Sequence, residues 1–323
     1  MQKKALVLYN KLSKKPKDDE ADVIEQVEMV TGALGSLGYQ VSHLQLDLNL
    51  GKGIRTIRKI APDLIFNLVE TIGNKGEFTF LATSLLNHLR IPYSGSPLIP
   101  MFLCSNKFLA KKELQRLGIG TPAGFGLDEL HLLQPGGRYI LKPTWEEGSL
   151  ELDEENVFAG SDQAFIRRIA AMSRQHYFVE EFIDGREFNI SILGGNTGPE
   201  VLPLAEMTFL DYPEGKPRIM GYRSKWDDRS FEYSHTRRTF SRKAGDGALR
   251  QELERVCLRC WHELGLKGYV RVDFRVTPDL IPLVIDINLN PCLSESGGFM
   301  AASKKKGYTF TEVMARVLED AFR

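Results

Sequence analysis

The residues best suited to chemistry lie near the C-terminus, in two short segments that alternate apolar and polar side chains. The first segment reads Arg271-Val-Asp-Phe, and the second reads Ile285-Asp-Ile-Asn-Leu-Asn-Pro. This alternation predicts a β-strand for each segment, and residues 277–279 supply turn-forming side chains between them. The sequence therefore predicts a hairpin that carries polar residues at defined positions.

Three oxygen ligands and one cation are expected to project from this hairpin. Because successive side chains of a strand point to opposite faces, Arg271 shares a face with Asp273, and Asp286 shares a face with Asn288. If the two faces coincide, these oxygens suit Mg²⁺ (or Mn²⁺), which completes its shell with phosphate and water. The alternative is an ordinary solvated hairpin. The apolar surroundings favour a metal–nucleotide site, because unpaired charges are costly there.

Two lysines elsewhere in the chain are placed to meet phosphate groups. Lys107 opens a predicted helix, and Lys142 ends an apolar strand immediately before Pro143. Two such ammonium groups can neutralise a polyphosphate, since lysine acts as a point charge. Either lysine taken alone could equally be a surface residue with its charged end in water. The pair is consistent with a nucleotide site.

A third segment could hold a planar base and a sugar. The predicted strand 177–181 is apolar and ends in Glu180 and Glu181, and Glu187 follows after a turn. Apolar walls and carboxylate acceptors suit an adenine amino group and ribose hydroxyls, although an exposed hairpin with solvated acids is the alternative. The polar turn around Gly148 and Ser149 could cradle phosphate or be a plain loop. Neither of the two glycine-rich nucleotide motifs, G-x-x-x-x-G-K-[ST] and G-x-G-x-x-G, occurs in the chain.

Strands and helices alternate over the first hundred residues, which predicts a parallel sheet with crossover helices. Ligand-binding loops are expected at 10–20 and 70–76, where strands end. Further helices are predicted at 105–117, 162–172 and 248–264 and from residue 311. Strands 177–181 and 186–193 are expected to form a hairpin through Asp184-Gly185. Residues 210–241 read as a long irregular loop, a type that is usually functional.

Length and composition set limits on the class of protein. The 323 residues are enough for two or three subdomains, and 42 basic residues balance 42 acidic ones. This balance argues against nucleic acid or an acidic membrane as a partner. The four cysteines show no disulfide framework, and Cys257 and Cys260 fit a helical core better than a zinc site. Without a membrane-spanning apolar run, the chain is predicted to be soluble and cytoplasmic.

Together these segments resemble the ATP-grasp superfamily and, within it, the D-alanine–D-alanine ligase group. The resemblance runs over nearly the whole chain, and the order and spacing of its pieces are more specific than any single piece. The pieces are Asp63-Leu-Ile-Phe-Asn-Leu, Gly76-Glu-Phe, Ile91-Pro-Tyr-Ser-Gly-Ser, Ser105-Asn-Lys, Gly118-Ile-Gly-Thr-Pro, Ile140-Leu-Lys-Pro, Val179-Glu-Glu-Phe-Ile, Gly268-Tyr-Val-Arg-Val-Asp and Asp286-Ile-Asn-Leu-Asn-Pro.

The resemblance implies an α/β protein with an ATP-grasp fold and an N-terminal Rossmann-like domain. The implied divisions are an N-terminal domain at 1–100, a small ATP-grasp subdomain at 101–182 and a C-terminal subdomain at 183–323 that carries the Mg-ATP and substrate site. By position, two lysines match the phosphate-binding lysines and four residues match the adenine and ribose edge, partly through backbone atoms. These are Lys107 and Lys142, and Glu180, Glu181, Ile183 and Glu187.

The remaining matches concern metal, catalysis and substrate. Asp273, Asp286 and Asn288 match magnesium ligands. Arg271 matches an arginine that stabilises the tetrahedral intermediate. Lys225 matches the lysine of the mobile loop over the phosphates, and Ser149 matches a serine of the lid. Ser296 and Gly297 fall near the carboxylate-binding segment.

The implied reaction is ATP-dependent, ADP-forming ligation. ATP phosphorylates a substrate carboxylate, a second amino-acid-like substrate attacks the acyl phosphate through its amine, and phosphate leaves. The cofactors implied are ATP and Mg²⁺, the partners are small amino-acid or peptide substrates, and a homodimer is common in the group. Two alternatives stay open: a peptide or natural-product ligase of the same fold, and a nucleotide-binding regulator without ligase activity.

Differences from the family pattern concern the substrate end. Cys292 occupies the position where the family has glycine after Pro291, and the lid segment after Gly148 holds less glycine and serine than usual. The loop 67–71 lacks the His-Gly pair that is usual in D-alanyl ligases. The identity of the two substrates is therefore left open by the sequence.

Overall fold

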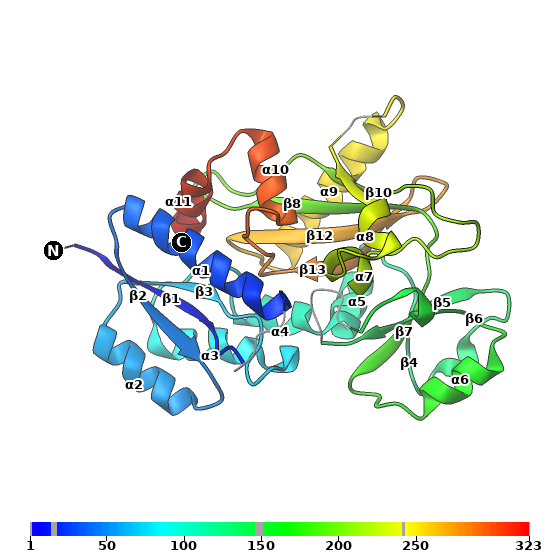
Figure 1. Cartoon of the computed structure of the whole chain (residues 1–323), viewed down its shortest axis with the longest axis horizontal. Helices are drawn as coiled ribbons and strands as arrows, with labels where there is room; N and C mark the ends of the chain where they lie inside the picture. Colours follow the sequence, from blue (N-terminus) through cyan, green and yellow to red (C-terminus); the bar gives the residue numbers. More distant parts are fainter. Residues whose placement is uncertain (1, 14–17, 146–150, 241–242, 323) are drawn as a thin grey trace.

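The computed structural model describes residues 2–13, 18–145, 151–240 and 243–322. These residues form three β-sheets and the helices that pack against them (Figure 1). The first sheet is parallel, with strand order β2-β1-β3, as predicted from the alternation of strands and helices. Its elements are β1 (Lys4–Asn10), α1 (Asp18–Ser36), β2 (Gln40–Leu46), α2 (Leu50–Ile60), β3 (Leu64–Leu68) and α3 (Phe80–Leu89).

The central strand β1 is buried on both faces, and its side chains divide between two helix layers. Ala5 and Val7 join a core with α1, whereas Leu6 and Leu8 join a core with α2 and α3. This division follows from the two-residue period of a strand. It explains why the strand reads as a continuous apolar run, which is typical of a parallel sheet covered on both sides.

The second sheet is small and antiparallel, with strand order β4-β7-β5-β6. Two helices lead into it, and a third follows β6. These elements are α4 (Leu98–Ser105), α5 (Lys107–Arg116), β4 (Gly124–Gly126), β5 (Arg138–Pro143), β6 (Val157–Ala159), α6 (Gln163–Ala170) and β7 (Tyr177–Glu181). The helix predicted at 105–117 begins at Lys107, because Asn106 is extended and its Oδ1 accepts the backbone N–H of Leu109 at 2.8 Å.

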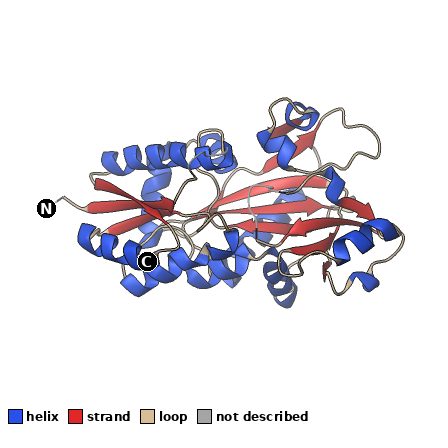
Figure 2. Ribbon diagram, turned by 60° about the horizontal axis from the view of Figure 1, so that its bottom comes forward, coloured by secondary structure: helices blue, strands red, loops and turns tan. Residues whose placement is uncertain are grey.

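The third sheet is the largest, with strand order β11-β10-β8-β12-β13 and the short β9 paired to β8. Figure 2 shows its strands extending away from the N-terminal sheet. The strands are β8 (Arg186–Leu193), β9 (Glu200–Val201), β10 (Ala205–Phe209), β11 (Thr236–Thr239), β12 (Tyr269–Val276) and β13 (Pro282–Asn288). The helices are α7 (Tyr222–Trp226), α8 (Phe231–His235), α9 (Gly247–Glu263), α10 (Gly298–Lys306) and α11 (Phe310–Ala321).

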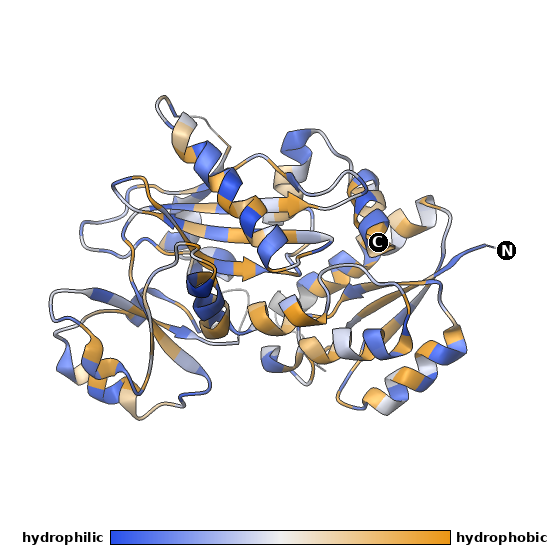
Figure 3. Cartoon of the chain, turned by 180° about the vertical axis from the view of Figure 1, so that it is seen from behind, coloured by the Kyte–Doolittle hydropathy of each residue, from blue (hydrophilic) through white to orange (hydrophobic). Residues whose placement is uncertain are grey.

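Helix α9 covers the back of this large sheet, and Figure 3, seen from behind, shows many hydrophilic residues along it. Its buried face includes Cys257 and Cys260, which lie in the apolar core as the sequence predicted. The chain then returns to the first sheet, since residues of α10 and α11 share a core with α1 and β3. The rings of Phe66 and Tyr269 stack across this junction at 6.2 Å.

The predicted hairpin through Asp184-Gly185 is wrong. Strands β7 and β8 belong to different sheets, so the segment between them is a crossing from the second sheet to the third. A Cβ atom on Gly185 would lie 2.0 Å from the backbone oxygen of Val276. The glycine is therefore required by this close backbone approach, and not by a tight turn.

The prediction of an irregular loop at 210–241 was also wrong in part. This stretch contains α7, α8 and β11, and β11 pairs with β10 as an edge strand. Its short elements escaped detection because each spans only four or five residues, too few to show a hydrophobic period. Within the described ranges, no helix is long and apolar enough to cross a membrane.

Candidate active site

A cavity of about 650 Å³ is lined by residues of the second and third sheets, together with α1 and the loop 70–79 of the N-terminal part. Its volume lies within the range of small-molecule sites. The structure brings thirteen of the fourteen predicted site residues to this cavity. They are Lys107, Lys142, Glu180, Glu181, Ile183, Glu187, Lys225, Arg271, Asp273, Asp286, Asn288, Ser296 and Gly297. The fourteenth, Ser149, lies outside the described residues.

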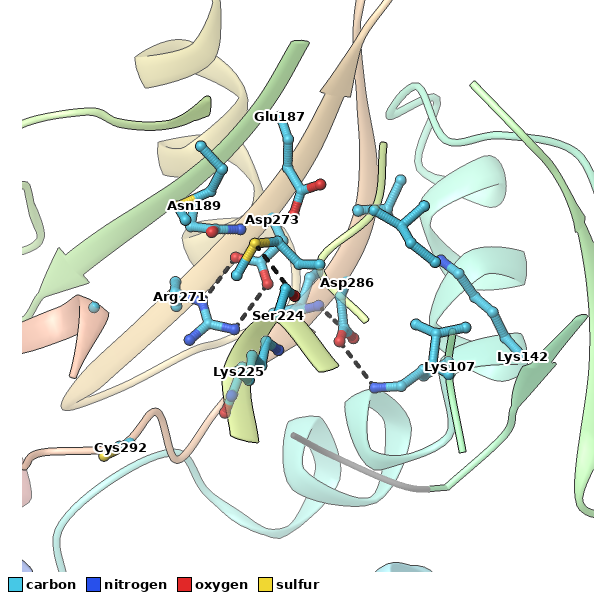
Figure 4. Close-up of a pocket in the computed structure, with 18 of the residues that line it drawn as sticks. Lys107, Lys142, Glu187, Asn189, Ser224, Lys225, Arg271, Asp273, Asp286 and Cys292 are labelled. Atoms are coloured by element: carbon cyan, nitrogen blue, oxygen red, sulfur yellow. Dashed lines mark hydrogen bonds and ion pairs between the residues drawn. The ribbon is translucent and has the colours of Figure 1, made fainter. Parts of the chain in front are cut away.

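The hairpin of β12 and β13 forms one wall of the cavity, with its polar side chains on a common face. Arg271 pairs in register with Asn288, and Asp273 pairs with Asp286. The arginine donates two hydrogen bonds to Asp273, each 2.8 Å long (Figure 4). The polar face of β12 and the polar face of β13 therefore coincide, a point that the sequence alone left open.

Lys107 reaches the same hairpin from the start of α5. Its Nζ lies 2.8 Å from Oδ2 of Asp286, and its backbone N–H donates to the carbonyl of Thr144. Burial alone would raise the pKa of Asp286, but Lys107 at contact distance, with Lys142 and Arg271 nearby, lowers it overall. Asp286 is therefore held as a carboxylate beside a lysine.

Lys142 on β5 forms a second ion pair, with Glu180 on the adjacent strand β7. The Nζ–Oε1 distance is 2.7 Å, and the second carboxylate oxygen lies 2.7 Å from Lys111, which the sequence analysis had not singled out. Burial would raise the pKa of Glu180, but Lys111 and Lys142 together lower it. Because both of its oxygens face ammonium groups, this side chain is committed to the lysines.

Glu187 lies on β8, on the same face of the third sheet as the hairpin carboxylates. It pairs with Arg275 of β12 at 2.8 Å. Burial raises the pKa of Glu187; Arg275 opposes the shift and Asp273 adds to it. A carboxyl group in this environment can exchange hydrogen bonds with the hydroxyl groups of a ligand.

Lys225 enters the cavity from α7, opposite the hairpin (Figure 4). Burial and the neighbouring Arg271 lower the pKa of Lys225, while Asp273, Glu187 and Asp286 act against them. Helix α7 is held in place through its first residue, Tyr222, whose backbone N–H donates to the carbonyl of Leu152 at 2.7 Å. The segment that contains Leu152 therefore fixes the position of the helix that carries Lys225.

The opposite end of the cavity is formed by the loop 292–297 and the start of α1. The thiol of Cys292 donates to Asp22 at 2.9 Å and lies 2.9 Å from the hydroxyl of Ser294. Burial and the carboxylate of Asp22 raise the pKa of this thiol, which keeps it protonated. Gly297 has no room for a side chain, because a Cβ atom would lie 2.7 Å from the carbonyl oxygen of Cys292.

Some cavity residues were missed by the sequence analysis. Asn189 pairs in register with Asp273, so the alternation of β8 after Glu187 would have revealed it. Asp22 and Arg238 come from α1 and β11, where no local pattern points toward the hairpin. The guanidinium of Arg238 donates to the backbone carbonyl of Ser296 at 3.3 Å.

The oxygen atoms of the hairpin fit Mg²⁺ better than a transition metal. Across the described part of the chain, no group of three or more His, Cys, Asp and Glu side chains is arranged to hold a metal. Two facing carboxylates and one amide are a short oxygen set, which suits an ion that retains water and phosphate ligands. In the structure, Lys107 and Arg271 balance these two carboxylates.

Comparison with known proteins gives a consistent result. The family described as D-ala D-ala ligase C-terminus matches residues 157–319, just over half of the chain. The D-alanine–D-alanine ligase of Magnetococcus marinus is 28% identical over 337 residues, covering 99% of this chain and 98% of that protein.

Solved structures match the whole fold. The D-alanine–D-alanine ligase of Bacillus anthracis complexed with ATP covers 100% of this chain and 98% of that chain, with a TM-score of 0.73 and 18% identity. The D-alanyl-alanine synthetase A of Vibrio cholerae has a TM-score of 0.76 at 15% identity, with both chains fully covered. These likenesses confirm the predicted ATP-grasp fold.

Proposed function

Because this chain belongs to the D-alanine–D-alanine ligase family, we propose that it joins the carboxylate of one amino acid to the amine of another while ATP is cleaved to ADP. The family confirms the expected enzyme class, an ATP-dependent carbon–nitrogen ligase. The observation that carries the proposal is that one cavity brings together lysines suited to phosphate, the oxygen ligands of the hairpin and the loop 292–297.

The nucleotide is proposed to lie between the second and third sheets. Lys107 and Lys142 would neutralise its phosphates, and the backbone around Glu181 and Ile183 would border the adenine. The side chain of Glu180 is occupied by two lysines, so adenine contacts in this segment are expected through backbone groups. Glu187 would accept from the ribose hydroxyls.

Mg²⁺ is proposed to bind the oxygens of Asp273, Asp286 and Asn288, where it would screen the charge on the phosphates. In the structure these two aspartates contact Lys107 and Arg271. Binding of Mg-ATP would therefore release both cations from the carboxylates. Lys107 would then face the phosphates, and Arg271 would face the reacting carbonyl.

The proposed reaction needs no nucleophile from the protein. The substrate carboxylate takes the terminal phosphoryl group of ATP, and the resulting acyl phosphate is attacked by the amine of the second substrate. Arg271 would stabilise the negative charge on the tetrahedral oxygen, and Lys225 would cover the transferring phosphate. Ser296 and Gly297 would border the carboxylate of the second amino acid. Ser149 lies outside the described residues, and its role in the lid stays a prediction.

D-Alanine is the first substrate to test, because it is named in the relatives that match over most of their length. A ligase for larger peptide acceptors remains a second candidate, favoured by Cys292 and the loop 67–71, where the chain departs from the family pattern. The subdomain limits at 100 and 182, the homodimer and the cytoplasmic location remain predictions.

The test is phosphate release from Mg-ATP over a panel of D- and L-amino acids, alone and in pairs, with mass spectrometry of the products. The proposal predicts release that depends on at least one pair and yields the matching dipeptide. Turnover with peptide acceptors alone would favour the second candidate. Tight ATP binding without turnover for any pair would contradict ligation and favour a nucleotide-binding regulator.

A further inference from the structure

Lys111 is a buried lysine that stands behind the wall of the cavity. Its side chain is 3% exposed. Lys111 is not one of the described residues that line the cavity. Its Nζ lies 2.7 Å from Oε2 of Glu180 and donates to Oγ1 of Thr121 at 2.7 Å and to the carbonyl of Pro122 at 2.9 Å. Two hydrogen bonds and one ion pair therefore hold the ammonium group in place.

The hydrogen-bond directions identify Nζ of Lys111 as a donor. The hydroxyl of Thr121 donates its own proton to the carbonyl of Val284 at 2.7 Å, so its oxygen can only accept from the lysine. The carbonyl of Pro122 is an acceptor in any state. Nζ therefore donates both hydrogen bonds, and its third contact is the 2.7 Å ion pair with the buried carboxylate of Glu180.

The arrangement sets the charge at the phosphate end of the cavity. Glu180 is shared by Lys111 behind the wall and Lys142 within the cavity, so one carboxylate balances two ammonium groups. The three side chains together carry one surplus positive charge. Without Lys111 the remaining pair would be neutral, and the charge of Lys142 would be spent on Glu180.

The backbone is shaped to let this lysine reach Glu180. Gly124 of β4 pairs in register with Glu180, and a Cβ atom on Gly124 would lie 2.4 Å from Cδ of Lys111. The aliphatic part of Lys111 therefore passes through the space that a side chain would fill. Lys111 also follows Lys107 by four residues, so both lysines project from one side of α5.

From these contacts we propose that Lys111 is a positioning residue for the nucleotide phosphates. It neutralises Glu180 and leaves the charge of Lys142 available to the polyphosphate. This inference rests on the proposed ATP site, since a surplus cation has meaning only if an anion binds beside Lys142. It adds to that site a residue that does not touch the ligand.

The test compares binding of ATP and of adenosine to the full-length protein and to Lys111→Met. The ratio of the two affinities isolates the phosphates, because contacts to the base and sugar cancel. Loss of one unit charge acting over roughly 10 Å in a partly buried site should weaken ATP by about ten-fold. Adenosine binding should change little. Equal affinities for ATP in both proteins would overturn the inference.

A charge rescue separates electrostatics from damaged packing. Glu180→Gln alone leaves two lysines without a carboxylate, whereas Lys111→Met with Glu180→Gln restores a single surplus charge. The double variant should therefore regain most of the ATP-to-adenosine ratio that Lys111→Met loses. A double variant that is worse than either single variant would show that the residues act through packing alone, and the inference would fail.

Two further variants complete the set. Gly124→Ala should displace Lys111 without altering any charge and should lower the same ratio. Arg316→Met removes a cation that pairs with Glu200 away from the cavity, so it should leave the ratio unchanged even if stability falls. If the unmodified protein binds no ATP, the proposed function and this inference both fail. A normal wild-type ratio that Lys111→Met does not change overturns the inference alone.

Discussion

At the scale of single residues, the charged side chains of the cavity are paired with one another as ion pairs. Asp286 contacts Lys107, Asp273 contacts Arg271 and Glu180 contacts Lys142. Buried pairs of this kind contribute little net stability, because desolvation offsets much of their attraction. The two pairs on the hairpin are better explained by exchange, in which Mg-ATP replaces Lys107 and Arg271 as the partners of the aspartates.

Removal of either hairpin aspartate should abolish turnover while the fold persists. Asp273→Ala or Asp286→Ala is expected to lower kcat by roughly a hundredfold or more, since charge stabilisation in a preorganised site is lost. Steady-state phosphate release measures the effect, and circular dichroism checks the fold.

A suitable control lies in the same hairpin. Asp279 is exposed in the turn between β12 and β13, so Asp279→Asn changes one charge without touching the cavity. It should retain full activity. Full activity in Asp273→Ala or Asp286→Ala would show that the metal site has been misplaced.

The sequence was sufficient to find the hairpin residues, because strand alternation determines which side chains share a face. Arg271, Asp273, Asp286 and Asn288 all follow this rule, and their register completes the site. Lys111 was missed because a buried lysine four residues after another reads as a surface helix position. Asp22 was missed because its place depends on how α1 docks against the loop 292–297.

At the scale of elements, residues 152–154 are held against the segment around α7 by a group of ion pairs, here called the latch. Glu154 accepts from Arg223 at 3.0 Å and pairs with Lys216 at 3.3 Å, and Lys216 also contacts Glu232 at 2.6 Å. A Cβ atom on Gly221 would lie 2.8 Å from the carbonyl of Leu152, so the two segments touch through their backbones. This contact places Lys225 over the cavity.

Weakening the latch should loosen the segment that carries Lys225. Glu154→Gln removes a carboxylate from two ion pairs, each of which contributes about 0.2–1 kcal/mol. Limited trypsin cleavage within 210–240 should become about two- to five-fold faster, because cleavage follows the population of the open form. Glu155 is exposed and adjacent, so Glu155→Gln is the matched control. Equal cleavage rates in both variants would argue against a latch.

Helices α10 and α11 are tied to the third sheet through Glu200 of β9. Its carboxylate accepts from Tyr308 at 2.8 Å and contacts Lys306 at 2.7 Å and Arg316. Burial would raise the pKa of Glu200, but its three hydrogen-bond donors lower it to about 2. A carboxyl whose pKa falls on folding stabilises the protein above its unfolded pKa and loses this effect as pH decreases.

The stability of the protein should therefore show a specific acid dependence. Glu200→Gln should be less stable than the unmodified protein at pH 7, and the difference should shrink as pH falls from about 4.5 toward 2. Urea unfolding at a series of pH values measures it. A difference that stays constant over this range would refute the role assigned to the carboxylate.

Element-level prediction succeeded where hydrophobic periodicity was long enough to be read. Strand β7 was predicted with its bounds, and α9 within one residue at each end. The hairpin at Gly185 failed because a glycine between two strands can serve a turn or a close crossing, and only tertiary contacts distinguish them. Long-range docking, not local propensity, decides such cases.

At the scale of the whole molecule, the second and third sheets and the N-terminal part of the chain supply separate parts of one cavity. The third sheet carries the oxygen ligands, the second sheet supplies Lys142, and the N-terminal domain reaches the far end through Asp22 and Glu70. The chain matches its ligase relatives over nearly the full length, so all of these parts fall within the matched region. Because the phosphate-binding residues and the far end belong to one cavity, the account predicts direct transfer of a phosphoryl group from ATP to a carboxylate.

Isotope transfer tests this central claim most directly. The protein is incubated with Mg-ATP and with its best amino-acid pair, in which the carboxylate of the first substrate is labelled with oxygen-18. The account predicts that each released phosphate carries one labelled oxygen, because the carboxylate oxygen leaves with the phosphoryl group of the acyl phosphate. Dipeptide formation with unlabelled phosphate would contradict the account, since the carboxylate would then not have been phosphorylated.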